Sequence, residues 1–180
     1  MYVVPATPHA TKQILNMTHT DNIQGIIKAM TAYGGDCEDY EHFWNDDNII
    51  LFNEWMRQQP KVSGITLYRG YTFDESYFND TGIEVGAVIG EDALTQESLP
   101  SFTSDMLRAA NYVNEFGETE LTCVVKALFV IVTHGKAFVD ISRLSYYPEE
   151  NEYKCTDSVK LKVVAFERKA GLWQITMEEI

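Results

Sequence analysis

The chain has 180 residues, of which 45% are hydrophobic, and its formal net charge is -13. This length suits one domain, residues 1–180, with a substantial core. The 14 Lys plus Arg against 27 Asp plus Glu argue against nucleic acid as the main partner, because binding the phosphate backbone requires a positive face.

The sequence also lacks the signals of a membrane or secreted protein. No apolar run approaches the roughly 20 residues that cross a bilayer, and the first residues lack the basic and apolar regions of a secretory signal. We therefore expect no membrane partner and a cytoplasmic location, in the producing cell or in a target cell after delivery. We also expect a monomer.

The metal-binding residue types show no useful pattern. The three cysteines, Cys37, Cys123 and Cys155, are odd in number and lack the spacing of metal ligands. The four histidines are scattered. The sequence predicts reduced thiols, no metal site and no histidine-based catalytic dyad.

The first 60 residues predict a helical part with two helices. The second helix runs from Asp47 to Gln59, where Pro60 stops it. The first ends at Gly34-Gly35 and carries apolar residues at helical spacing: Ile23, Ile26, Ile27 and Met30.

A strand is predicted over Ile65–Phe73, and it contains Arg69. Alternation places Arg69 in line with core-facing residues, where a guanidinium needs an anion or several acceptors. Gly70 leaves room for a ligand or a neighbouring backbone. The alternative is an edge strand whose arginine faces solvent.

After the strand that contains Arg69, the sequence predicts a loop at Asp74–Gly82 and a short strand at Ile83–Ile89.

Three hydroxyl residues precede the next predicted helix, which starts near Met106 and ends by Gly117. Ser104 or Asp105 suits the N-cap of this helix. Ser101 lies too far upstream to cap the helix, so it is the stronger candidate for a hydrogen bond to a polar substrate or to a catalytic acid. Thr103 lies between Ser101 and Ser104.

The remaining residues predict mostly strands. They cover Leu121–Val132, Lys136–Ile141, Val159–Arg168 and Leu172–Met177, with a hairpin turn at Gly171. Helices followed by strands indicate an α+β fold.

Tyr147–Tyr153 carries two acids, Glu150 and Glu152, two residues apart. In an extended segment both side chains would project to one side, roughly 6.5 Å apart. Such a pair could present two carboxylates to one substrate. An exposed acidic turn is the alternative.

Taken in order, Leu67-Tyr68-Arg69-Gly70, Ser101-Phe102-Thr103-Ser104 and Glu150-Asn151-Glu152 resemble the arginine, serine, glutamate signature of the toxin-like mono-ADP-ribosyltransferases. The resemblance covers roughly residues 65 to 168. It implies N-terminal helices packed on a mostly antiparallel, split β-sheet, with residues 61–180 forming the part that binds NAD.

The resemblance also implies roles. Arg69 would contact a phosphate of NAD, and the Gly70 backbone would hold the nicotinamide carboxamide. Ser101, Thr103 and Ser104 are alternatives for the serine that supports the catalytic acid. Glu152 would bind the nicotinamide ribose, and Glu150 would orient and deprotonate an arginine acceptor.

Other positions have counterparts in the family. Tyr146 and Tyr147 resemble the aromatic residues that contact a target protein. Arg108, Tyr112 and Phe116 are alternatives for the basic and aromatic residues near nicotinamide.

The predicted function is transfer of ADP-ribose from NAD to an arginine of a protein. Two rivals remain. One is an NAD glycohydrolase, in which water replaces the protein acceptor. The other is a non-catalytic acidic binding or inhibitor protein with the same fold.

Overall fold

The computed structural model describes residues 23–28, 31, 46–95, 100–115, 124–169 and 171–180. The chain divides into two compact units. The first contains Met1–Trp55 and Leu144–Tyr147, and the second contains Met56–Arg143 and Pro148–Ile180. That the chain folds as one domain stays a prediction.

The first unit is helical where it is described. Residues 23–28 form a helix that buries Ile23, Ile26 and Ile27, in agreement with the predicted apolar stripe. The hydroxyl of Thr31 donates to the Ile27 carbonyl at 2.9 Å. The Tyr146 amide donates to the same hydroxyl at 2.8 Å, so Thr31 anchors the segment that carries Tyr146.

Helix α3 (Asp46–Gln58) confirms the second predicted helix. Within the first unit, Phe52 stacks on Trp55 with ring centroids 6.0 Å apart. Phe52 is fully buried, so the aromatic residues of this helix serve the core, as the sequence pattern indicates.

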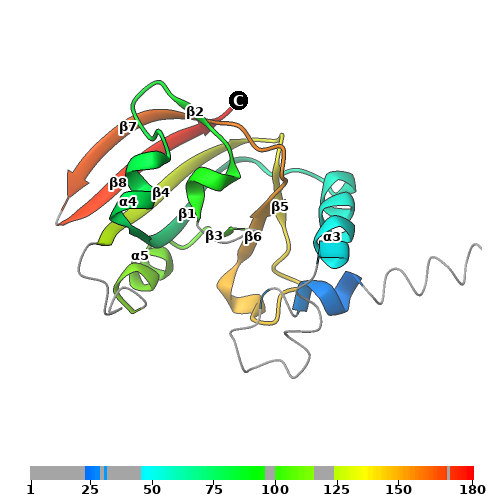
Figure 1. Cartoon of the computed structure of the whole chain (residues 1–180). Coiled ribbons are helices and arrows are strands. Elements are labelled where there is room, and N and C mark those ends of the chain that lie inside the picture. Colours follow the sequence, from blue (N-terminus) through cyan, green and yellow to red (C-terminus); the bar gives the residue numbers. More distant parts are fainter. Residues whose placement is uncertain (1–22, 29–30, 32–45, 96–99, 116–123, 170) are drawn as a thin grey trace, which may run out of the picture. The chain divides into compact units, whose positions relative to one another are not determined.

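Within the described residues the second unit forms a sheet of eight strands in the order β2-β7-β8-β4-β1-β3-β6-β5 (Figure 1). The strands are β1 (Ser63–Asp74), β2 (Val88–Ile89), β3 (Ser101–Thr103), β4 (Val124–His134), β5 (Phe138–Asp140), β6 (Glu152–Cys155), β7 (Leu161–Lys169) and β8 (Leu172–Glu179). Among these strands, β4 and β8 are parallel and the other neighbours are antiparallel. The α+β prediction with a mostly antiparallel sheet is confirmed.

The sheet has a narrow junction at β1. This strand pairs with β4 from Ser63 to Asp74. On its other side, in the part of the chain that the structure describes, it shares a single register pair with β3, Tyr68 with Thr103. The split that the resemblance implies therefore lies one residue from Arg69.

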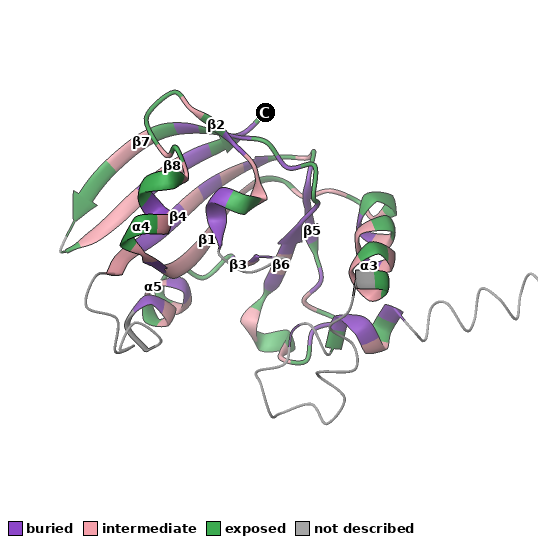
Figure 2. Ribbon diagram, in the orientation of Figure 1, coloured by how far each residue is buried: buried purple, intermediate pink, exposed green. Residues whose placement is uncertain are grey.

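The core of the second unit gathers apolar side chains from both sides of this junction. Figure 2 shows buried residues along β4, β6 and β8. Phe73 on β1 packs edge-on against Phe129 on β4, with ring centroids 5.9 Å apart. Phe102 on β3 packs in the same way on Phe138, at 5.1 Å.

Residues 74–82 do not form the predicted loop. They contain helix α4 (Glu75–Asp80), because the Asp74 carboxylate caps it by accepting from the Ser76 amide at 2.9 Å. Phe78 anchors the helix against Phe73, with ring centroids 5.4 Å apart. The predicted strand Ile83–Ile89 was also too long, since β2 covers only its last two residues.

Helix α5 (Met106–Glu115) lies on the sheet face opposite to α4. Successive strand residues point to opposite faces, and α4 contacts Phe73 whereas α5 covers Gly70. A Cβ atom at Gly70 would lie 1.8 Å from the Ala109 carbonyl oxygen. Gly70 therefore permits the close approach of a neighbouring backbone, one of the two roles that the sequence leaves open.

None of the helices among the described residues is both long enough and apolar enough to cross a membrane.

We predict that Gly70→Ala lowers the free energy of unfolding by about 3 kcal/mol, because α5 must move away from β1 to admit the methyl group. Urea denaturation monitored by circular dichroism measures this. Thr72→Val on the same strand is the matched control. Its hydroxyl oxygen is buried without a hydrogen-bond partner among the described residues, so we expect a change below about 0.5 kcal/mol. Equal stability of the two variants would contradict the tight packing of α5 on Gly70.

Candidate active site

Arg69 lies next to the junction of β1 and β3 and binds two backbone carbonyls. Its Nε donates to Leu94 at 3.1 Å and its Nη1 to Ser101 at 2.9 Å. The guanidinium also lies over the Tyr71 ring, 4.7 Å from its centroid. Arg69 thus has the acceptors that its position on a core-facing strand requires, and it does not simply extend into solvent.

Ser101 connects Arg69 to the acid on β6. While its carbonyl accepts from Arg69, its hydroxyl accepts from Lys154 Nζ at 2.6 Å. Lys154 Nζ also lies 3.4 Å from Glu152 Oε1. The arginine and the serine of the predicted signature are therefore joined directly, and Lys154 joins the serine to the glutamate.

Both charged groups of this link are buried, Lys154 at 2% and Glu152 at 6% relative exposure. Burial lowers the pKa of the Lys154 ammonium, and the neighbouring Glu152 carboxylate opposes that shift. Moving either charge out of water costs free energy, so each buried group is stabilised by the opposite charge of the other.

The sequence reasoning missed Lys154. The signal was available: Lys154 continues the alternation of Glu152 on β6, two residues further along the strand, so both side chains start from the same face. The register pairs Ser101 with Lys154 and Thr103 with Glu152, which places all four side chains on that face. That pairing could not be read from the sequence.

The two acids are not presented by one extended strand, as the spacing predicted. Pro148–Glu150 forms a 3₁₀ helix, and Asn151 adopts a φ of 48° before β6 begins at Glu152. Asparagine tolerates this left-handed conformation better than most residues. The two acids therefore do not share one continuous strand, and the separation of roughly 6.5 Å that such a strand predicts for their side chains does not apply.

Thr103 positions the segment that carries Glu150. Its hydroxyl donates to the Glu150 carbonyl at 2.8 Å and accepts from the Asp105 amide at 3.1 Å. Asp105 in turn caps α5, because its carboxylate accepts from the amides of Leu107 and Arg108. Asp105 is the N-cap, one of the two residues that the sequence offered.

The Glu150 carboxylate lies against α5. Arg108 Nη1 donates to Glu150 Oε1 at 2.8 Å, and the Tyr112 hydroxyl lies 3.3 Å from Oε2. The Glu150 side chain is 16% exposed and that of Arg108 is 34% exposed. The structure thus brings two of the alternatives for the basic and aromatic residues, Arg108 and Tyr112, onto Glu150; Phe116 lies outside the described residues.

The remaining candidates lie apart from this network. Ser104 hydrogen-bonds the side chain of Tyr153. Tyr146 and Tyr147 belong to the first unit, where their rings meet at 4.9 Å between centroids. That Tyr146 and Tyr147 contact a target protein stays a prediction.

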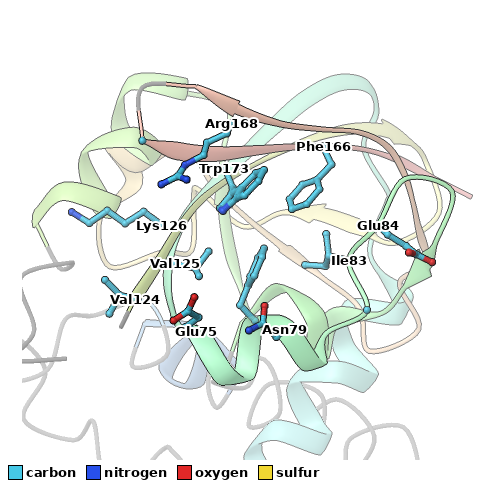
Figure 3. Close-up of a pocket in the computed structure, with 13 residues that line it drawn as sticks. Glu75, Asn79, Ile83, Glu84, Val124, Val125, Lys126, Phe166, Arg168 and Trp173 are labelled. Carbon is cyan, nitrogen blue, oxygen red and sulfur yellow. The ribbon is translucent and has the colours of Figure 1, made fainter. Parts of the chain in front are cut away.

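A pocket of about 650 Å³ lies elsewhere in the second unit, between α4, the start of β4 and the β7–β8 hairpin (Figure 3). Phe166 and Trp173 stack along its wall, with ring centroids 4.5 Å apart. None of the candidate residues lines it, so it is separate from the Arg69 network. The described residues contain no group of three His, Cys, Asp or Glu side chains that could hold a metal ion.

We predict that Lys154→Met lowers the free energy of unfolding by about 3–5 kcal/mol at pH 7, because it removes the cation that faces the buried Glu152 carboxylate. The double variant Lys154→Met/Glu152→Gln removes both charges and should recover part of that loss. Urea denaturation measures the free energy of unfolding of the wild-type protein and of both variants. Lys162→Met, at an exposed position of β7, is the control and should change stability by less than about 0.5 kcal/mol. A Lys154→Met variant as stable as Lys162→Met would refute the ion pair.

No protein-family model matches this sequence, and no curated protein does. Solved ADP-ribosyltransferase structures do match the fold. The Vis toxin from Vibrio splendidus aligns with a TM-score of 0.62 at 15% identity, over 99% of this chain and 88% of that one. ADP-ribosyltransferase Vis in complex with agmatine gives 0.56 at 17% identity, over 92% and 70%. An ADP-ribosyltransferase from Clostridium botulinum gives 0.55 at 12% identity, over 99% and 98%. This chain therefore has the fold of the toxin-like ADP-ribosyltransferases, as the arginine, serine, glutamate resemblance implies.

Proposed function

We propose that this protein is a mono-ADP-ribosyltransferase that transfers ADP-ribose from NAD to an arginine side chain of a target protein. The observation that carries the proposal is the connected set of Arg69, Ser101, Lys154 and Glu152 on β1, β3 and β6. In a fold shared with ADP-ribosyltransferases, these strands hold the residues of the predicted signature.

Glu152 is the proposed acid at the ribose. Breaking the bond between nicotinamide and its ribose develops positive charge on the sugar, as in glycoside hydrolysis. A carboxylate held in place beside that centre stabilises the transition state more than the ground state. Lys154 and the surrounding strands hold the Glu152 carboxylate in one position, so little reorganisation is needed when the charge forms.

Glu150 is the proposed base for the acceptor. An arginine guanidinium is protonated and becomes nucleophilic only when a base removes a proton during attack. Glu150 already accepts a hydrogen bond from a guanidinium, that of Arg108, so its carboxylate is suited to this partner.

Arg69 and Gly70 are the proposed contacts to NAD itself. The chain carries a net charge of -13, which repels a pyrophosphate, and a guanidinium at the junction of β1 and β3 offsets that repulsion locally. The Gly70 backbone would hold the nicotinamide carboxamide. Its missing side chain faces α5, so the space that Gly70 leaves serves the packing of that helix and the proposed contact involves backbone atoms only.

The acceptor class has support from one compared structure. Vis was solved with agmatine, a small guanidine, and a guanidine is the group that an arginine acceptor presents. We propose that Tyr146 and Tyr147 contact the target protein. Tyr146 is 41% exposed, which suits an aromatic residue at a protein interface.

An NAD glycohydrolase is the second candidate. The observation that favours it is the Arg108 guanidinium on Glu150, because an occupied carboxylate receives an external acceptor less readily. A non-catalytic protein with this fold is the third candidate. Calorimetric titration with NAD distinguishes it from the two enzymes, since a protein that does not bind NAD should produce no heat.

We predict that Glu152→Gln lowers both ADP-ribosyl transfer and NAD hydrolysis by at least about a hundredfold. Glu150→Gln should remove transfer to a guanidine acceptor but leave hydrolysis measurable, because water needs less help from a base than a guanidinium does. Labelled NAD with agmatine as acceptor allows nicotinamide release and labelled product to be followed together.

Glu149→Gln is the matched control, since Glu149 is an exposed neighbour of both acids and should retain both activities. Transfer at the wild-type rate by Glu152→Gln would refute the assignment of the catalytic acid. Hydrolysis without any transfer by the wild-type protein would favour the glycohydrolase.

A further inference from the structure

The acid proposed to hold the acceptor already holds an arginine of the same chain. Arg108 Nη1 lies 2.8 Å from Glu150 Oε1. The Tyr112 hydroxyl approaches both oxygens of that carboxylate, at 3.5 and 3.3 Å. A guanidinium of the protein therefore already binds the carboxylate that is proposed to bind an acceptor guanidinium.

Hydrogen bonds fix the backbone around Arg108. Arg108 lies in the first turn of α5, and its amide donates to the capping Asp105 carboxylate at 3.2 Å. The Asp105 amide donates to Thr103, whose hydroxyl donates to the Glu150 carbonyl. Thr103 is also the register partner of Glu152 on β6. One residue thus connects the segment of Arg108 with both acids.

We propose that Arg108 is itself an acceptor, so that the protein ADP-ribosylates its own Arg108. The inference rests on the proposed function, because it requires NAD as donor and Glu150 as the base. It adds a modification site on α5 that the sequence signature does not contain.

The proposed step conserves atoms and electrons. The bond between the nicotinamide nitrogen and the ribose C1″ breaks, and its electron pair leaves with nicotinamide. Glu150 takes a proton from Arg108 Nη1, and that nitrogen forms a new bond to C1″. The proton passes from Glu150 to solvent, so NAD and Arg108 give ADP-ribosyl-Arg108, nicotinamide and one proton.

Arg108 is both positioned for reaction and accessible. Its guanidinium is held on the base in the same chain, which gives it a large effective concentration relative to a free acceptor. Its side chain is 34% exposed, so it is not sealed in the core.

Arg57 provides an internal comparison. It also pairs with a carboxylate, that of Asp157, and its side chain is more exposed, at 52%. Modification controlled by exposure alone would therefore favour Arg57. Modification controlled by Glu150 favours Arg108.

The test is incubation of the full-length protein with NAD and no other acceptor, followed by intact mass measurement and peptide mapping. We expect one ADP-ribosyl group on Arg108 and at least about tenfold less on Arg57, since only Arg108 is held on the proposed base. The fraction modified at a given time should not depend on protein concentration, because the reaction occurs within one chain. Arg108→Lys and Glu150→Gln should each remove the adduct, and circular dichroism checks that both variants fold.

A parallel reaction with agmatine separates the possible failures. Transfer to agmatine without an adduct on Arg108 would overturn this inference and leave the proposed function standing. An adduct distributed over exposed arginines, or one that persists in Glu150→Gln, would also overturn it. Absence of nicotinamide release, agmatine transfer and adduct together would overturn both.

Discussion

The candidate site depends on one buried ion pair, between Lys154 and Glu152. Lys154 Nζ bonds the Ser101 hydroxyl at 2.6 Å and lies 3.4 Å from Glu152 Oε1, while the Ser101 carbonyl binds Arg69. The lysine therefore connects β6 to β3, and Ser101 connects β3 to β1. Since β1 and β3 meet at one register pair among the described residues, this network crosses the sheet where its backbone pairing is weakest.

Burial alone does not identify an acid as functional. Glu179 on β8 is even more buried than Glu152, at 2% against 6% exposure. Its carboxylate accepts hydrogen bonds from the backbone amides of His134, Lys136 and Ala137, so it holds the connection between β4 and β5. Glu152 faces a lysine side chain beside the signature residues instead. The partners of the two acids, and not their exposure, separate a structural role from a proposed catalytic one.

Much of the fold could be predicted from local patterns, but less of the site. Alternation along β1 correctly indicated that Arg69 needs acceptors, and the N-cap rule correctly offered Asp105. The continuous strand through Glu150 and Glu152 was wrong, because Asn151 adopts a positive φ that spacing cannot reveal. Lys154 and the Arg108–Glu150 pair depend on how β3 pairs with β6 and where α5 packs, which are contacts between distant segments.

NAD must bind where β1, β3 and β6 meet if Glu152 and Arg69 are to act on it. A crystal structure with a non-hydrolysable NAD analogue tests this most directly. We predict that the nicotinamide ribose lies within hydrogen-bonding distance of the Glu152 carboxylate and that the pyrophosphate lies beside Arg69. An analogue bound instead in the pocket along Phe166 and Trp173, with Glu152 still facing only protein groups, would contradict the proposed site.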